Sequence, residues 1–183
     1  MRVTYHEAKF TEMVLFVAGR LRDDRVGGAS KLARVLYFSD FAHVRRHGRP
    51  ITGAPYVRAG AGPTPSELRA VRDRLVAEGL AEIVIEDFLG YETRRLVAVG
   101  EIACTVLSDP ELVTINGVLD NLAGLTGKQI DDLTQGEPGW RCTADGDVIP
   151  YEAALIARRQ IVTPTGRRLA EEAAARYGII VPA

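Results

Sequence analysis

Residues 31–47 carry apolar side chains around almost the whole circumference of the helix that their spacing predicts. These side chains are Leu32, Val35, Leu36, Phe38 and Phe41. A helix that is apolar on nearly all sides cannot lie on a surface, because part of its apolar area would remain in water. We therefore expect it to run through the centre of the fold. Ser30 is placed to cap its start and Gly48 to end it.

Further helices are predicted on both sides of this segment from a period near 3.6 and from capping signals. The clearest start is TPSEL, where Thr64 is the expected N-cap, Pro65 the first helical residue and Glu67 the partner of the cap amide. A second start, SDPEL, is predicted at 108–112. The segments outside the central helix are 10–22, 64–78, 109–125, 127–134, 151–159 and 163–178.

One part of the chain alternates with a period near two. Residues 80–87 and 93–100, joined by a turn at 88–92, predict a β-hairpin. Two stretches rich in proline, glycine or polar residues, 49–63 and 135–150, are expected to be loops, and long loops are often functional. The predicted fold class is therefore α+β and predominantly α-helical: a single domain over 1–183, with six to seven helices and a β-hairpin in the middle.

Composition is typical of a globular protein rather than a disordered one. Of the 183 residues, 46% are hydrophobic and 26% are charged, which is enough apolar area for a core. No apolar run reaches the roughly 18 residues that a membrane span needs, and charged residues stand where a signal peptide would be apolar. We expect a cytoplasmic protein without membrane association. Cys104 and Cys142 are expected to be free, since a disulfide is unusual in a reducing compartment.

Charge is segregated along the chain although the net charge is only −1. Residues 31–74 contain nine basic and three acidic residues, whereas 75–147 contain four basic and fourteen acidic ones. A basic surface attracts acidic proteins or nucleic acid. The alternative is that the two blocks neutralise each other across the folded molecule.

Patterns for catalysis or metal binding are weak. The glycine-rich stretch before TPSEL could hold a phosphate at a helix N-terminus, but it lacks the third glycine of a dinucleotide loop. His43 and His47 have the spacing of metal ligands, and Asp40 could be a third; the alternative is two histidines in water. No serine lies in G-x-S-x-G. We predict no catalytic residue, no metal and no cofactor.

A helix followed directly by a hairpin has the order of a winged-helix recognition element. Arg69 and Arg72 share the helix face opposite its apolar stripe. The hairpin, however, carries four acidic residues, which repel phosphates. Nucleic acid is therefore the less favoured partner, and the alternative is that these arginines face water or a protein.

Two blocks of the sequence resemble one known family. KLARVLYFSDFAHVRRHGRPITGAPYV with GPTPSEL, and ELVTINGVLDNLAGLTGKQIDDLTQGEPGWRCTADGDVIPYEAALI, are similar to the Panacea domain of SocA-like antitoxins over residues 30–157. The motif residues of the first block are Tyr37, Asp40, Pro50, Thr52, Gly53 and Pro63. Two positions depart from the family pattern: Gln135 stands where many members have histidine, and Ala61 where they have tyrosine.

The resemblance implies an antitoxin of a type II toxin–antitoxin system. Such a protein binds a toxin protein and blocks it without catalysis of its own. Some SocA-like members instead act as adaptors that deliver the toxin to a Clp protease. For that role the C-terminal YGIIVPA is a candidate recognition tail. The resemblance identifies neither the toxin nor the stoichiometry of the complex.

A toxin-binding surface is predicted around the C-terminal end of the central helix. Arginine is enriched at interfaces because its planar group binds carboxylates with two hydrogen bonds. The residues proposed to face the toxin are Lys31, Arg34, Arg45, Arg46, Arg49, Arg58 and Trp140. For Trp140 core packing is the alternative. Arg49, Thr52 and Gly53 have a structural alternative: Gly53 would need a positive φ, and the other two would tie the loop to helix ends.

Overall fold

The computed structural model describes residues 1–156 apart from 25, 27, 61 and 89–90, together with 168 and 172. Over this part of the chain the fold is α+β and predominantly helical, as predicted, with six α-helices, two two-stranded antiparallel sheets and one 3-10 helix. In chain order the elements are α1 (Glu7–Arg20), α2 (Ala29–His47), β1 (Tyr56–Ala59), β2 (Gly62–Pro65), α3 (Leu68–Ala77), β3 (Ala81–Phe88), β4 (Tyr91–Ala98), α4 (Asp109–Leu122), α5 (Gly127–Gln135), α6 (Pro138–Cys142) and η1 (Tyr151–Leu155).

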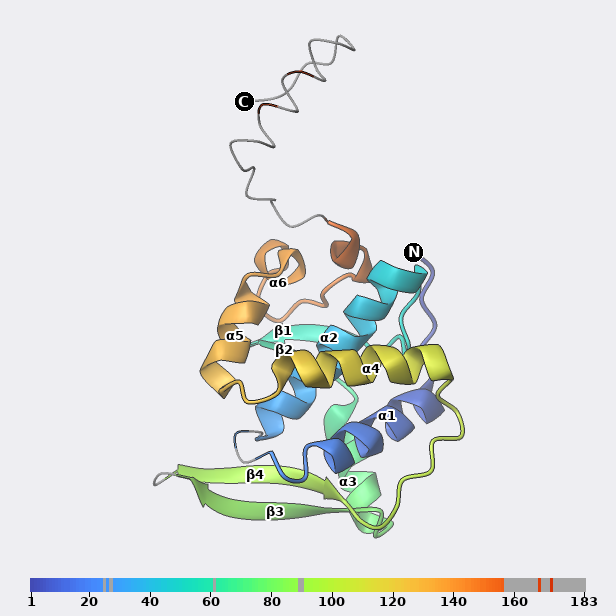
Figure 1. Ribbon diagram of the computed structural model, residues 1–183, viewed down its shortest axis with the longest axis vertical. Coiled ribbons are helices and arrows are strands. Elements are labelled where there is room, and N and C mark those ends of the chain that lie inside the picture. The colour runs from blue at the N-terminus through green and yellow to red at the C-terminus, as the bar shows by residue number, and fades with distance from the viewer. Residues whose placement is uncertain are drawn as a thin grey trace.

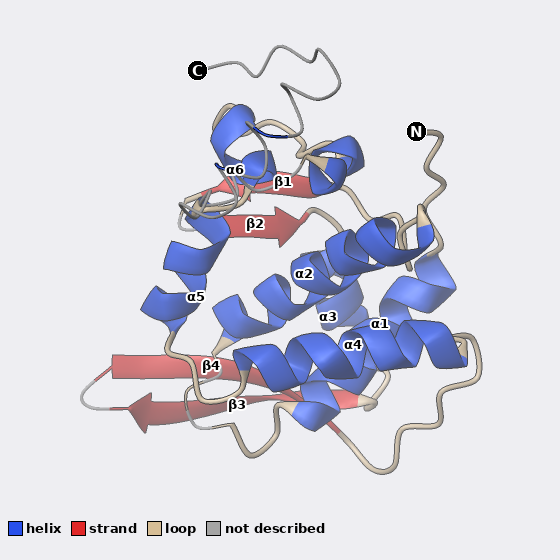
Figure 2. Ribbon diagram, turned by 45° about the horizontal axis from the view of Figure 1, so that its top comes forward, coloured by secondary structure: helices blue, strands red, loops and turns tan. Residues whose placement is uncertain are grey.

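Helix α2 lies in the middle of the fold (Figure 1), which confirms the prediction of a central helix. It contacts α1, α4, α5 and η1 as well as strands β2 and β4, and Figure 2 shows α4 lying alongside it. Twelve of its 19 residues are buried, among them Val35, Leu36 and Phe41. Full burial of one such side chain contributes about 1.5–3 kcal/mol. The packing of α2 is therefore a main source of stability.

Strands β3 and β4 form the predicted hairpin. They pair antiparallel in a register that places Ile83 opposite Leu96 and Ile85 opposite Arg94. The hairpin lies at the end of the molecule opposite α6 and η1 (Figure 1). Residues two apart in a strand share one face of the sheet, so Leu96 and Ile85 belong to the same face. Leu96 is buried against the core, whereas Ile85, farther toward the tip, is exposed.

Most of the predicted helix ends are confirmed. Gly48 ends α2 in the left-handed conformation, with φ of +72°, Ser108 is the N-cap of α4, and the Thr126 side chain caps α5. The cap predicted at Ser30 is wrong, because α2 already begins at Ala29. Ser30 therefore lies within the first turn.

The capping box predicted at Thr64 is wrong. Thr64 belongs to strand β2, where it is paired with Val57, and α3 begins only at Leu68. The residue before a proline is restricted to extended backbone, which suits a strand as well as an N-cap. The amide of Ser66 donates to the carbonyl of Pro55, so this segment stays tied to the β1–β2 hairpin instead of entering a helix.

Both predicted loops contain regular structure. Residues 49–63 hold strand β1 and the start of β2, and β1 makes one further bridge from Val57 to Val148. Residues 135–150 hold helix α6, which begins with Pro138 at its first turn. The helix predicted at 151–159 is a 3-10 helix as far as the described residues go. The helix predicted at 163–178 and the tail YGIIVPA lie outside the described residues, except for 168 and 172.

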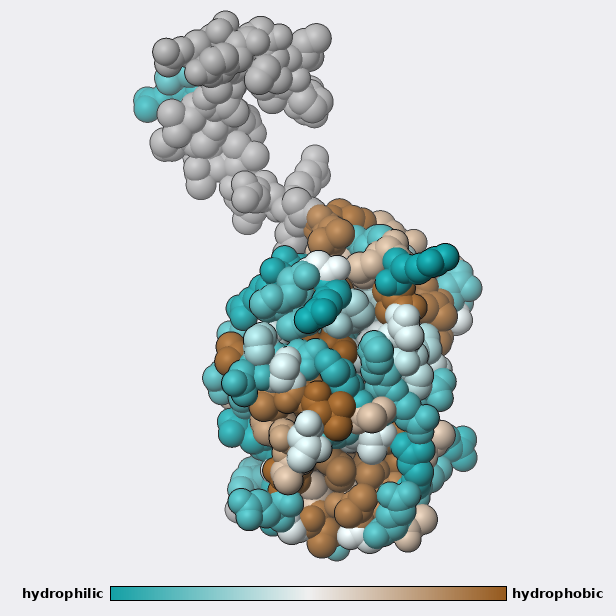
Figure 3. Space-filling model, turned by 90° about the vertical axis from the view of Figure 1, so that its right-hand side faces the viewer, coloured by the Kyte–Doolittle hydropathy of each residue, from teal (hydrophilic) through white to brown (hydrophobic). Residues whose placement is uncertain are grey.

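The surface is mixed in polarity. On the face in Figure 3, apolar residues gather in the lower part of the body, toward the end where α3, β3 and β4 lie. Exposed apolar side chains of the segments at that end include Val76, Leu80 and Val99. In the part of the chain that the structure describes, no helix is long and apolar enough to cross a membrane.

Candidate functional site

The motif residue Asp40 is the centre of a buried hydrogen-bond cluster. Its carboxylate accepts from the backbone amide of Thr52 (2.8 Å), the Thr52 hydroxyl (2.5 Å), and the hydroxyls of Tyr56 (2.8 Å) and Tyr151 (3.2 Å). Burial raises the pKa of Asp40, and the hydrogen bonds from Thr52 and Tyr56 oppose that shift. The cluster joins α2, the segment after it, β1 and η1. Its residues are buried, so it organises the fold rather than meeting a ligand.

Gly53 has the structural role that the sequence offered as an alternative. Its φ is +70°, and a Cβ at this position would lie 2.3 Å from the carbonyl oxygen of Thr4. Glycine is therefore required both by the backbone conformation and by the close approach of the N-terminal segment. The amide of His6 donates to the carbonyl of Thr52 (2.8 Å), so the N-terminal segment is also hydrogen-bonded to the residue before Gly53.

The other motif residues are also wholly or partly internal. Tyr37 is buried, and its ring centroid lies 4.2 Å from that of Phe41 and 5.5 Å from that of Tyr56. Pro50 is half-buried, and Pro63 is buried in β2. The motif therefore describes how α2 and the segment after it pack together.

The expectation that Lys31 and Arg34 lie on the outside is wrong. They are only 2% and 4% exposed. The ammonium of Lys31 lies 2.6 Å from Asp24, and Arg34 contacts the Asp131 carboxylate (3.2 Å) and the Pro63 carbonyl (2.9 Å). Because the N-terminal part of α2 is surrounded by other elements, even these two charged side chains are buried, and a buried charge requires a partner. These two residues join elements within the chain and are not accessible to a toxin.

Arg58, which is half-buried, and the buried Trp140 contact each other. The guanidinium of Arg58 lies 4.6 Å from the centroid of the Trp140 ring and donates to the carbonyls of Trp140 (2.9 Å) and Thr143 (2.5 Å). Trp140 is 7% exposed. Core packing, the alternative stated for Trp140, is therefore the correct interpretation, and Arg58 holds α6 against β1.

The remaining predicted arginines are exposed at the end of α2. Arg46 and Arg49 are exposed, and no hydrogen bond or ion pair to another described residue is found for either. The guanidinium of Arg45 already has partners within the chain, since it donates to the carbonyl of Ala154 and to the buried carboxylate of Glu137. Of the seven residues proposed from the sequence, these three keep an exposed cationic group.

The two histidines of α2 do not form a metal site. His43 is 2% exposed, and its Nδ1 lies 3.2 Å from the hydroxyl of Thr114. Burial and the nearby His47 lower the pKa of His43 to about 4. Asp40, the third ligand considered, is engaged in the cluster described above. Across the described residues, no group of three or more histidine, cysteine, aspartate or glutamate side chains could hold a metal ion.

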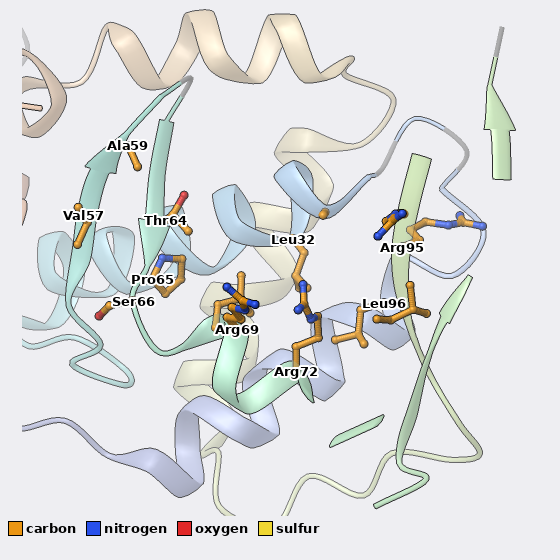
Figure 4. A pocket seen from close by; sticks show the side chains of 14 residues that line it. Leu32, Val57, Ala59, Thr64, Pro65, Ser66, Arg69, Arg72, Arg95 and Leu96 are labelled. Carbon is orange, nitrogen blue, oxygen red and sulfur yellow. The ribbon is translucent and has the colours of Figure 1, made fainter. Parts of the chain in front are cut away.

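A second surface brings four arginines together in a cleft of about 560 Å³. The cleft lies between the N-terminal part of α2, the two hairpins and α3 (Figure 4). Arg69 and Arg72 come from α3, and Arg94 and Arg95 from β4. The sequence indicated the first pair through the winged-helix order. The second pair was missed, because neighbouring residues of a strand are expected on opposite faces.

One known family matches a large part of this chain. The model of the family "Antitoxin SocA-like, Panacea domain" matches residues 32–141. The chain belongs to this SocA-like antitoxin family. The resemblance predicted from the motifs is therefore confirmed. No curated protein and no solved structure matches the chain.

The matched part of the Panacea domain runs from α2 to α6. It contains both hairpins, the Asp40–Thr52–Tyr56 contacts and all four arginines of the cleft. Tyr151, which completes the cluster, lies beyond the matched residues. No local pattern in the sequence indicates its contact with Asp40, although Tyr151 belongs to the IPYE segment that resembles the family.

Proposed function

We propose that this Panacea domain protein is the antitoxin of a type II toxin–antitoxin pair and neutralises its toxin by direct, non-catalytic binding in the cytoplasm. The observation that carries this proposal is the family match over residues 32–141. The buried Asp40 cluster ties α2, β1 and η1 together, and a partner-binding surface that is ordered before binding has a smaller ordering cost.

The proposed contact surface at the end of α2 consists of Arg45, Arg46 and Arg49. We call these three residues the α2 rim. Arg46 and Arg49 are available for carboxylates of a toxin, whereas Arg45 would have to share its guanidinium with Glu137. Charges of this kind steer association and fix orientation more than they add affinity.

The test is to purify the product of the adjacent open reading frame, the expected toxin, and to titrate it with this protein in a calorimeter. A stable complex is expected, with loss of toxin activity at equimolar ratio. The variant R46E/R49E should bind at least about tenfold more weakly, because like charges would meet across the interface. The matched control is R2E/R141E, which changes the net charge equally at two exposed positions outside the rim.

Two outcomes contradict different parts of the proposal. If the wild-type protein forms no complex with that product, the antitoxin function is wrong for this pair. If R46E/R49E is folded and binds as tightly as the control variant, the toxin contacts another surface, and the antitoxin function stands.

A further inference from the structure

The arginine-lined cleft is built from segments that are distant in the sequence. Strands β1 and β2 line one side, β3 and β4 the other, and α3 lies between them; Figure 4 shows Arg69 and Arg72 projecting from α3 beside Leu32 and Leu96. Its volume of about 560 Å³ is within the range of natural ligand sites.

The charge of the lining has one sign. The described residues that line the cleft include four arginines and no aspartate or glutamate. The carboxylates that pair with these arginines, Asp73, Glu86 and Glu92, do not line the cleft and are 55%, 45% and 59% exposed at their side chains. Exposed ion pairs contribute about 0–1 kcal/mol each. An incoming carboxylate can therefore replace these partners at little cost.

The arginines differ in how firmly they are held. Arg95 is 12% exposed at its side chain and donates to the carbonyls of Arg22 (2.8 Å) and Asp24 (3.1 Å) as well as to Glu86. Arg69 and Arg94 are 87% and 68% exposed, and their ion pairs with described residues stay within their own elements. Arg72 is 38% exposed and likewise pairs with a residue of its own helix, Asp73, so three of the four arginines can reorient toward an incoming carboxylate.

Between the arginines the cleft is apolar. Leu32 and Leu96 form its buried wall, and Ile83 is 42% exposed beside them. Ile85 continues the same face of β3 beyond the cleft and is 57% exposed. Covering large exposed apolar side chains of this kind with another apolar group is favourable, because it removes apolar area from water. An anion without an apolar part would leave this area uncovered.

We propose that the cleft binds an acidic segment of a partner protein that carries an apolar side chain, with its carboxylates on Arg69, Arg72 and Arg94. The inference rests on the proposed function in taking the toxin as that partner. Nucleic acid fits less well, because a sugar–phosphate backbone would pair with the arginines but leave the exposed apolar side chain of Ile83 uncovered.

The test is calorimetric titration of the expected toxin into three variants of the full chain. The charge variant R69E/R94E changes the two most exposed arginines of the cleft, and the apolar variant I83S replaces the exposed isoleucine of its wall. We expect each to weaken binding at least about tenfold relative to the wild-type protein. The control R2E/R141E should bind like the wild-type protein, and far-UV circular dichroism should show all three variants folded.

The outcomes separate this inference from the proposed function. Tight toxin binding by the wild-type protein and equally tight binding by both cleft variants would overturn the cleft assignment and leave the antitoxin function intact. No toxin binding by the wild-type protein would overturn both. Nucleic acid, the rival occupant, is tested by measuring the binding of a fluorescein-labelled DNA duplex that carries the sequence upstream of the gene. If R69E/R94E loses binding to this duplex but keeps binding to the toxin, the occupant is nucleic acid and the inference is wrong.

Discussion

At the scale of single residues, the shared motif is explained by one buried carboxylate. Asp40 receives hydrogen bonds from Thr52, Tyr56 and Tyr151, and these bonds tie together segments up to 111 residues apart. The sequence identified Asp40, Thr52 and Gly53 by resemblance, but it did not predict their partners. A hydrogen bond between distant side chains leaves no periodic signal, because its geometry is fixed only after the chain has folded.

The variant D40A should therefore be strongly destabilised. It removes the acceptor and leaves an amide and three hydroxyls buried without that partner, which we expect to lower the free energy of unfolding by about 3–5 kcal/mol. D40N keeps the shape and one carbonyl oxygen, so its loss should be smaller. Urea denaturation measures both. The control D120A removes an exposed aspartate of α4 and should change stability by less than about 0.5 kcal/mol; a similar value for D40A would refute the role of the cluster.

At the scale of elements, local sequence patterns correctly predicted the helices, strands and caps that depend on residues close together in the chain. The apolar circumference of α2, the alternation of β3 and β4, and the caps at Ser108 and Thr126 are all short-range signals. The prediction of Thr64 as an N-cap was wrong for a physical reason. Extended backbone before a proline suits a strand and an N-cap equally, and Thr64 lies in a strand because it pairs with Val57. Burial of Lys31 and Arg34 was missed because their partners lie in other parts of the chain.

The connection between β4 and α4 is held by one side chain of α1. The carboxylate of Glu12 accepts from the amides of Thr105 (2.9 Å), Val106 (2.9 Å) and Leu107 (2.7 Å). Partial burial alone would raise the pKa of Glu12, but these hydrogen bonds outweigh burial and lower it. Because the pKa is lowered, the stabilisation is present at pH values above the usual range of a glutamate and is lost as the pH falls through the lowered value.

The variant E12A should loosen this connection. At pH 7 we expect faster amide exchange in residues 103–108 and a loss of about 1–2 kcal/mol in the free energy of unfolding, since three amides lose their acceptor. The difference from the wild-type protein should shrink on acidification. Hydrogen exchange with mass spectrometry measures the first effect. E101A removes an exposed carboxylate of the same connection and is the control; equal protection in E12A and E101A would contradict the role of Glu12.

At the scale of the whole molecule, part of the charge that is segregated along the chain is paired in ion pairs between elements, and part of it lines the arginine cleft. Basic residues of 31–74 pair partly with acidic residues elsewhere, as Arg34 does with Asp131 and Arg45 with Glu137. Neutralisation across the fold, the alternative stated from the sequence, therefore accounts for part of the asymmetry. The basic residues of this block that remain exposed include the α2 rim and Arg69 of the cleft. The cleft could not be predicted, because it exists only where elements distant in the sequence meet.

The central claim is neutralisation by direct binding, and growth tests it most directly. The adjacent open reading frame is placed under an inducible promoter, with and without this protein, in cells that contain or lack Clp protease. Induction alone should stop growth, and co-expression should restore it in both strains with a complex that co-purifies. Rescue only in cells with the protease would contradict direct neutralisation and indicate an adaptor, and toxicity without rescue in either strain would contradict the antitoxin function itself.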